Sequence, residues 1–294
     1  NNRGCTLREL GRCEEALAAF DAALAQRADF PEALNNRGLV LCDLQRHAEA
    51  VASFDRALAL DPRHAMALNN RGNALRSLGR LEEALADFER ALSVKPDFAE
   101  AYNNRGNVSR DLGRLEESEV DFKRALGLRP DLAEVSSSRL LGLLYQAHTP
   151  PQAILAEHRA YAERYETPLK SSWPHHGNVR DPERRLKVGY VSGDFRKHSV
   201  AYFLEPILAH HDQAQVEVYA YYTHTQHDPV TQRLQGYVDR WCGCAGWTDA
   251  RLAQQILEDG IDVLVDLSGH TAGNRLLTFA RKPAPVQVSY LGYA

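Results

Sequence analysis

Two loops of this sequence carry the residues best suited to binding an anionic ligand. Residues 192–198 read SGDFRKH and lead into a predicted helix, and residues 268–274 read SGHTAGN and also open a helix. A helix N-terminus attracts anions through its unpaired N–H groups and its dipole. His198 stands beside such a terminus, so the first loop is a candidate functional site. The alternative is a histidine that only caps its helix.

An asparagine motif recurs through the first part of the chain. Asn-Asn-Arg-Gly begins at residues 1, 35, 69 and 103, a spacing of 34 residues each time. An amide side chain has both donors and an acceptor, so a row of amides can pair with the backbone of an extended peptide without reading its sequence. The candidates for peptide binding are the second asparagines of the motif, Asn2, Asn36, Asn70 and Asn104. Amides that cap or cross-link neighbouring helices are an equally open interpretation.

Signatures of metals and cofactors are weak. Cys242-Gly-Cys244 has no second ligand cluster, and the adjacent His175 and His176 would point in different directions. The five cysteines are expected to be free thiols, since three of them lie among helical repeats that need no disulfide. Neither G-x-G-x-x-G after the first predicted strand nor G-x-x-x-x-G-K-[ST] occurs, which argues against a dinucleotide-dependent dehydrogenase and a P-loop enzyme.

The elements that would position these residues begin with a helical array. A 34-residue period is typical of tetratricopeptide repeats, in which small residues let paired helices approach closely. About four repeats in residues 1–135 predict an open α-solenoid, a superhelix whose groove binds polypeptide. The residues that recur in phase are Gly4, Gly38, Gly72 and Gly106; Ala16, Ala50, Ala84 and Ser118; Phe20, Phe54, Phe88 and Phe122; and Pro62, Pro96 and Pro130.

The array decays at its end. Ser137-Ser138-Arg139-Leu140 replaces the asparagine motif, and no repeat glycine follows. Helices are expected at 139–147 and 151–165, on either side of a Thr-Pro-Pro break, and a proline- and serine-containing linker at 167–185. We therefore assign residues 136–185 to capping helices and a linker.

Residues 186–294 alternate short β-rich runs with helical segments. This alternation predicts a parallel sheet covered by helices on both faces, a Rossmann-like α/β lobe. Ligands of such sheets bind beyond the carboxyl ends of the strands, so the loops after 191, 267 and 291 are the places to look. The predicted strands are 186–191, 216–222, 261–267 and 285–291, and the predicted helices lie near 199–211, 228–237, 248–258 and 273–281.

Composition excludes several classes of protein. The net charge of −4 and the interspersed signs give no broad basic face, so nucleic acid is not an expected partner. No apolar run approaches the roughly 20 residues that span a bilayer, and the first residues lack a signal-peptide core. The cytoplasm is the expected compartment.

Three sequence blocks resemble the O-linked N-acetylglucosamine transferase family, including its bacterial and plant-type members. The blocks are LKVGYVSGDF followed by His198, EDGID through Gly269-His270-Thr271, and RKPAPVQ through Leu291-Gly292-Tyr293. Their order behind tetratricopeptide repeats extends the resemblance over essentially the whole chain. It implies the N-terminal lobe of a GT-B type, inverting glycosyltransferase that uses UDP-N-acetylglucosamine and protein serine or threonine hydroxyls. Because no D-x-D pair is present to hold a divalent ion, no metal and no cofactor are expected.

The resemblance also implies roles for single residues. His198 matches the active-site histidine of the family, and a neutral imidazole can accept a hydroxyl proton near pH 7. His270 stands where animal members have tyrosine, so it is expected to line the site or to make a loop hydrogen bond. Asp194 and Lys197 are expected to support donor binding, although Asp194 could instead cap the next helix. The other expected donor-site residues are Gly269, Thr271, Gly292 and Tyr293, and the asparagine row is expected to hold substrate protein.

Two alternatives to this function remain open. The plant-type relatives suggest a protein O-fucosyltransferase that uses GDP-fucose, and a lobe without chemistry would leave a tetratricopeptide scaffold. The second lobe of the family, which supplies most contacts to the nucleotide, is not found before residue 294. The chain also begins inside a repeat without methionine. It is therefore expected to be part of a longer protein and to be inactive alone.

Overall fold

The computed structural model describes residues 1–291 and contains two compact units. Unit 1 is Asn1–Gln146 and unit 2 is Ala147–Ala294. The division falls inside the segment 136–185 that the sequence assigns to capping helices and a linker. Each unit is described by itself below.

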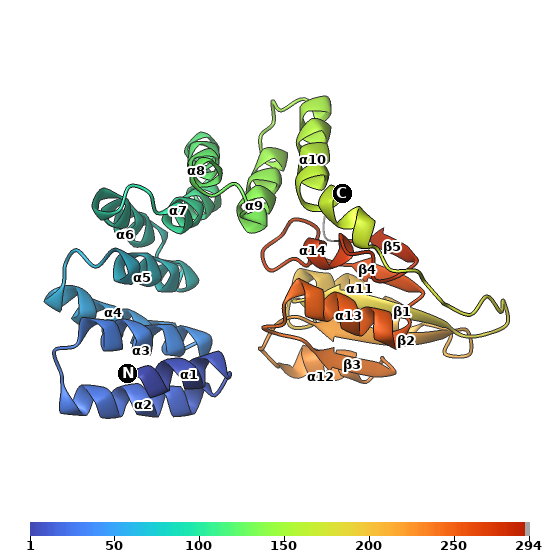
Figure 1. Cartoon of the computed structure of the whole chain (residues 1–294), viewed down its shortest axis with the longest axis horizontal. Coiled ribbons are helices and arrows are strands. Elements are labelled where there is room, and N and C mark those ends of the chain that lie inside the picture. Colours follow the sequence, from blue (N-terminus) through green and yellow to red (C-terminus); the bar gives the residue numbers. More distant parts are fainter. Residues whose placement is uncertain (292–294) are drawn as a thin grey trace. The chain divides into compact units, whose positions relative to one another are not determined.

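Unit 1 is a stack of paired helices (Figure 1). Helix α9 begins at Ala133, six residues before its predicted start, because the repeat register continues although the asparagine motif has decayed. Leu140, which replaces the repeat glycine, is 2% exposed and joins the packed interior. The helices are α1 (Asn2–Glu9), α2 (Cys13–Gln26), α3 (Pro31–Asp43), α4 (His47–Leu60), α5 (Ala65–Ser77), α6 (Leu81–Val94), α7 (Ala99–Asp111), α8 (Leu115–Leu128) and α9 (Ala133–Leu144).

The repeat glycine exists because a phenylalanine ring packs directly on it. A Cβ atom at Gly38 would lie 2.5 Å from the ring of Phe54, and one at Gly72 would lie 2.7 Å from the ring of Phe88. Two non-bonded carbon atoms cannot approach so closely without steric overlap, and the close-packed interior leaves no room for the ring to move away. Each of these rings is fully buried in the contact between the two helices of its own repeat.

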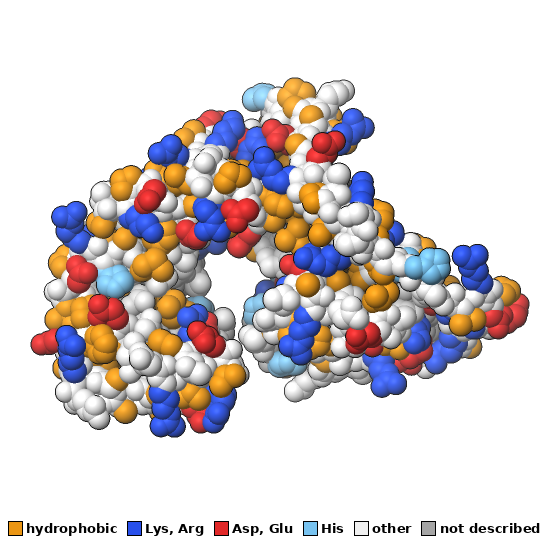
Figure 2. Space-filling model, viewed as in Figure 1, with side chains coloured by type: hydrophobic (Ala, Val, Ile, Leu, Met, Phe, Trp, Pro, Cys, Tyr) orange, Lys and Arg blue, Asp and Glu red, His pale blue; other side chains and the backbone are white. Residues whose placement is uncertain are grey.

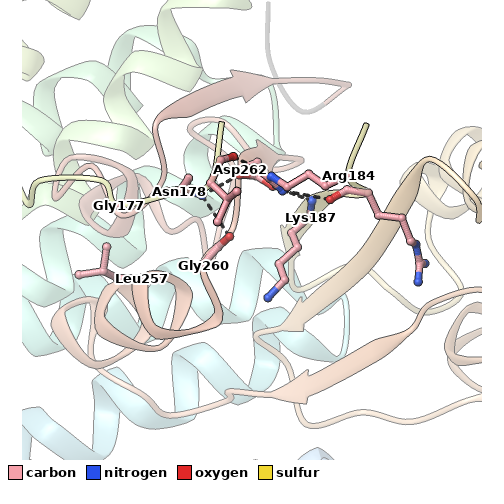
Figure 3. Close-up of a pocket in the computed structure, with 9 residues that line it drawn as sticks. Gly177, Asn178, Arg184, Lys187, Leu257, Gly260 and Asp262 are labelled. Carbon is pink, nitrogen blue, oxygen red and sulfur yellow. Dashed lines mark hydrogen bonds and ion pairs between the residues drawn. The ribbon is translucent and has the colours of Figure 1, made fainter. Parts of the chain in front are cut away.

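Unit 2 begins with helix α10 (Pro151–Tyr165), which has its predicted bounds, and the 3-10 helix η1 (Thr167–Ser172). The linker that follows is fastened to the sheet by Asp262. Both carboxylate oxygens of Asp262 accept from the Arg184 guanidinium, at 2.6 and 2.7 Å, and the Asn178 amide donates to Oδ1 at 2.7 Å. Figure 3 shows these three side chains pointing toward one another beside Lys187. They line a hollow of about 470 Å³ where strands β1 (Leu186–Ser192) and β4 (Val263–Asp266) begin, at the opposite end of the strands from the predicted site loops.

The core of unit 2 is a parallel five-stranded sheet with the order β3-β2-β1-β4-β5. Strand β3 was not predicted, because it is only four residues long and none of its residues is buried. Helix α14 is shorter than its predicted range, because the turn at Gly273, with φ of 73°, delays the helix. The strands are β1 (Leu186–Ser192), β2 (Val216–Tyr222), β3 (Arg240–Gly243), β4 (Val263–Asp266) and β5 (Val286–Ser289), and the helices are α11 (Ser199–Ala209), α12 (Pro229–Gln235), α13 (Asp249–Asp259) and α14 (Leu276–Phe279).

Both faces of the sheet are covered, as the alternation predicts (Figure 1). Along β2, Val218 and Tyr222 pack on one face with Leu204 of α11. Tyr221 packs on the other face with Ile256 of α13. Successive side chains of a strand point to opposite faces, so a strand between two helix layers is apolar throughout.

Candidate functional site

The strand order places the two predicted loops side by side. From β1 the chain moves outward through β2 to β3 and then returns to β4 on the other side of β1. Ligands of open α/β sheets bind at such a switch point, beyond the carboxyl ends of the strands. Residues 193–198 leave the end of β1, residues 267–275 leave the end of β4, and the Leu267 N–H donates to the Val191 carbonyl at 3.3 Å.

His198 is the N-cap of α11. Its Nδ1 accepts the N–H of Val200 at 3.3 Å and lies 3.6 Å from Oδ2 of Asp194. The side chain is 39% exposed, so a ligand can still reach the ring. A neutral imidazole that accepts at Nδ1 carries its proton on Nε2. The capping interpretation therefore describes Nδ1, and Nε2 is the atom that could act on a ligand.

The rest of the first loop is held from both sides. The Asp194 carboxylate accepts from Arg196 at 3.2 Å, and the Asp194 N–H donates to Ser192 Oγ at 2.9 Å. The hypothesis that Asp194 caps the next helix is wrong, because His198 occupies that position. The Lys197 N–H donates at 2.7 Å to Asp228, which also caps α12.

The second loop is organised by Asp266 at the end of β4. This carboxylate is 3% exposed and accepts the N–H groups of Ser268 and Gly269 at 3.0 and 2.9 Å. Gly269 has φ of 52°, in the left-handed region that favours glycine. The Thr271 hydroxyl donates to the Ser268 carbonyl at 2.7 Å. Burial raises the pKa of Asp266, although the N–H groups oppose this.

His270 is buried among aromatic rings and is 8% exposed. Its ring meets His158 and Tyr161 edge to face, with centroids 5.2 and 4.8 Å apart. Burial, with a smaller contribution from His158, lowers the pKa of His270 to about 4. A neutral His270 lines a hollow of about 350 Å³ together with Trp173 and Phe279.

The asparagine row cross-links successive repeats. The amide nitrogens of Asn36, Asn70 and Asn104 donate to the first asparagine of the preceding motif, at 3.1, 2.9 and 2.9 Å. Asn2 lies exposed at the start of α1. Asn36 also donates to Cys5 Sγ at 3.5 Å and accepts from the Asn35 amide at 3.4 Å, and Asn70 is only 8% exposed, so the cross-linking role occupies much of this row. The acceptors are Asn1, Asn35 and Asn69.

Comparison with known proteins identifies the family. Residues 139–294, just over half of the chain, match the description of glycosyl transferase family 41. The chain belongs to glycosyl transferase family 41. Residues 4–44, 29–97 and 69–133 match tetratricopeptide repeat families, in agreement with the helix pairs of unit 1.

Three relatives of this family 41 chain are informative. An Arabidopsis thaliana protein named as the probable UDP-N-acetylglucosamine–peptide N-acetylglucosaminyltransferase SPINDLY is 38% identical over 162 residues, which are 53% of this chain and 17% of that protein. A Caenorhabditis elegans enzyme named as a transferase of the same kind is 34% identical over 116 residues, 37% of this chain and 10% of that protein. A mutant of the Thermobaculum terrenum O-GlcNAc transferase superposes with a TM-score of 0.84 at 36% identity, over 90% of this chain and 50% of that one.

Two structural roles in this family 41 chain were missed by the sequence analysis. The arginine of the asparagine motif forms an ion-pair row; Arg71 binds both oxygens of Asp87 at 2.6 Å and also pairs with Asp55. Its 34-residue recurrence, from Arg3 to Arg139, was the available signal. Asp266 was also missed, and its signal was a carboxylate that ends an apolar strand.

The remaining predictions concern two donor-site residues, the cysteines, metal ligands and membrane-spanning helices. Gly292 and Tyr293 lie outside residues 1–291. Within those residues, all five cysteines are free, and no three His, Cys, Asp or Glu side chains are grouped so that they could hold a metal ion. No helix in the described part of the chain is long and apolar enough to cross a bilayer. On the face that Figure 2 shows, basic and acidic side chains are interspersed.

Proposed function

We propose that this sequence belongs to a metal-free, cytoplasmic protein O-GlcNAc transferase of GT-B type. The enzyme transfers N-acetylglucosamine from UDP-N-acetylglucosamine to serine or threonine hydroxyls of proteins. The observation that carries the proposal is the family 41 region folded as a parallel sheet, with His198 and the 268–271 loop at one switch point. The names of the relatives from Arabidopsis, Caenorhabditis and Thermobaculum supply the donor and the acceptor class.

The reaction is an inverting displacement. The acceptor oxygen attacks the anomeric carbon, the bond to the diphosphate oxygen breaks, and UDP leaves with the electron pair. The hydroxyl proton must be transferred to a base or to solvent. Negative charge grows on the diphosphate, so donors at the two loops would stabilise the transition state.

His198 has two possible roles in this step, and its contacts favour one of them. With Nδ1 accepting from Val200, Nε2 carries a proton and acts as a hydrogen-bond donor to the ligand. To act as a base, the ring must move its proton to Nδ1, which would then face Asp194 at 3.6 Å, beyond a normal hydrogen bond. We therefore propose that His198 orients the donor or acceptor through Nε2–H.

Donor profiling tests the proposed function. Because this chain spans half of the Thermobaculum enzyme, the assay uses the natural protein that contains this sequence. We expect mass spectrometry of an acceptor protein to show N-acetylhexosamine from UDP-N-acetylglucosamine, and no deoxyhexose from GDP-fucose. Transfer of fucose alone would establish the O-fucosyltransferase alternative, and no transfer from either donor would favour a scaffold.

The asparagine row is proposed to hold the acceptor protein. Joint replacement of Asn36, Asn70 and Asn104 by alanine is expected to weaken acceptor-protein binding while leaving glycosylation of a short peptide intact. Circular dichroism would show that the helices persist without the cross-links. Unchanged binding of the acceptor protein by the folded variant would remove the row from the proposal.

A further inference from the structure

A hollow in the second repeat lacks a carboxylate that the later repeats contain. It has a volume of about 370 Å³ and lies between α2 and α4, and α3 contributes one side chain, Arg37, to its lining. The residues that line it are Asp21, Leu24, Ala25, Arg37, Ala52, Ser53 and Arg56. The repeats provide an internal comparison for this hollow, because the same positions recur every 34 residues.

In the third repeat, the corresponding place is filled by Asp87. This carboxylate has a side-chain exposure of 3% and accepts two bonds of 2.6 Å from Arg71. Nη1 of Arg90 lies 3.7 Å from Asp87 on the other side. Arg71 also pairs with Asp55. The two guanidinium groups are therefore matched by two carboxylates, and the charges balance.

The fourth repeat also contains a buried carboxylate paired with its motif arginine. Asp121 has a side-chain exposure of 4% and accepts two bonds from Arg105, at 2.8 and 2.6 Å. Arg124 stands at the position of Arg90, 34 residues later. Two successive repeats thus supply their own carboxylate.

The second repeat keeps both arginines and replaces the carboxylate by a hydroxyl. Arg37 and Arg56 stand at the positions of Arg71 and Arg90, while Ser53 stands at the position of Asp87. Nη1 of Arg37 donates to Ser53 Oγ and its Nε donates to Asp21, both at 2.6 Å. Among residues 1–291, neither Nη2 of Arg37 nor the guanidinium of Arg56 has a hydrogen-bond partner. The lining of the hollow therefore contains two guanidinium groups and one carboxylate, Asp21, whereas the corresponding groups of the third repeat include two carboxylates, Asp55 and Asp87.

We propose that this hollow binds a carboxylate side chain of a protein segment docked on unit 1. The bound carboxylate takes the place that Asp87 fills in the third repeat, between Arg37 and Arg56. Arginine guanidinium groups recognise carboxylates through paired N–H donors, and the two later repeats display this recognition within the chain itself. The site is independent of the sugar-transfer chemistry.

Nuclear magnetic resonance of arginine Nε–Hε groups in the whole chain tests this site. The probe is N-acetylglutamate N-methylamide, with the glutamine analogue as its uncharged control and inorganic phosphate as a second anion. We expect a saturable shift of the Arg37 signal with the glutamate probe and no shift with the glutamine analogue. The Arg71 signal is the internal reference and is expected not to move.

Variants at the hollow supply the second readout. Ser53→Asp installs the carboxylate of the later repeats, so it is expected to abolish the Arg37 shift and to raise the midpoint of thermal unfolding. Ser53→Asn, the uncharged variant of the same size, is expected to do neither. Arg56→Gln, at an exposed position, is expected to weaken the binding of the glutamate probe at least threefold.

Several results would overturn the proposal. Equal shifts of Arg37 and Arg71 would show general ionic screening, and a response to phosphate without one to the glutamate probe would show a different ligand class. An unchanged response in Ser53→Asp would show that the probe binds elsewhere.

Discussion

The two site loops are held by hydrogen bonds between main-chain N–H groups and side chains. Asp266 accepts from Ser268 and Gly269, and His198 accepts from Val200. Such bonds fix the backbone before any ligand arrives, so little reorganisation is needed when charge develops in the reaction. The polar residues of this edge therefore act partly by positioning the loops.

His270 gives the stability of unit 2 a specific pH dependence. Its pKa in the folded chain, about 4, lies below the ordinary value of 6.5 because burial disfavours the charged ring. Its contribution is complete above pH 6.5 and is lost as the pH falls toward 4, by up to about 3 kcal/mol in all.

Urea unfolding between pH 7.5 and 4.5 measures this effect. We expect His270→Gln to lose less unfolding free energy over that interval than the wild type, whatever its stability at pH 7.5. Equal slopes in the two proteins would contradict a buried neutral His270.

Ser118 carries a hydroxyl that the repeat does not need. It is 2% exposed, and its Oγ has no hydrogen-bond partner among residues 1–291, whereas Ala16, Ala50 and Ala84 stand at the same position. Ser118→Ala is expected to raise the free energy of unfolding by about 1 kcal/mol, because a desolvated hydroxyl is removed. Ser77→Ala, at an exposed position, is the matched control and should change little. Loss of stability in Ser118→Ala would disprove this account.

At the scale of elements, the asparagine cross-links stop one repeat early. Asn103 Oδ1 is buried and has no hydrogen-bond partner in the described part of the chain, and the donor expected 35 residues later is replaced by Ser138. Ser138→Asn is expected to complete the row and to add about 0.5–1.5 kcal/mol to the free energy of unfolding. Ser138→Asp has the same size but no donor at neutral pH, so it should give no gain. Chemical denaturation that ranks the two variants equally would rule out the cross-link.

The contact between glycine and phenylalanine sets the spacing of the paired helices. Alanine in a helix is ordinarily favoured over glycine by about 1 kcal/mol. Gly72→Ala should nevertheless lower the unfolding free energy by about 1–3 kcal/mol, because its Cβ would meet the Phe88 ring. Gly127→Ala is the control, since a Cβ there meets no atom within 4 Å. Thermal unfolding in which both variants gain stability would contradict the packing.

The sequence predicts the repeats and most of the sheet because both have strong periodic signals. The 34-residue period predicts every repeat, and the β-rich run at 216–222 predicts β2 with its observed bounds. Edge strand β3 and the late start of α14 depend on pairing and loop turns, which leave little pattern in the sequence.

The site loops were predicted as segments, but not the bonds within them. Which atom of His198 is occupied, and that Asp266 holds the second loop, depends on geometry that residue types do not specify.

At the scale of the whole chain, the two units differ in how their interiors are packed. Unit 1 is a repeat array in which each helix pair packs on its neighbours, and such arrays present extended binding surfaces. Unit 2 is a parallel sheet with a switch point between β1 and β4, the place where open α/β sheets bind ligands. We propose that the first recruits protein and that the second takes part in modifying it.

The initial rate of sugar transfer tests this account most directly. It is measured by mass spectrometry in the natural protein that contains this sequence, with UDP-N-acetylglucosamine and an acceptor protein. We predict that His198→Ala slows transfer by at least about a hundredfold, because it removes the Nε2–H donor that orients the sugar donor or the acceptor. His210→Ala, which removes an exposed histidine just after α11, should leave the rate unchanged. Transfer at the wild-type rate by the His198→Ala protein would contradict the placement of the reaction at this sheet edge.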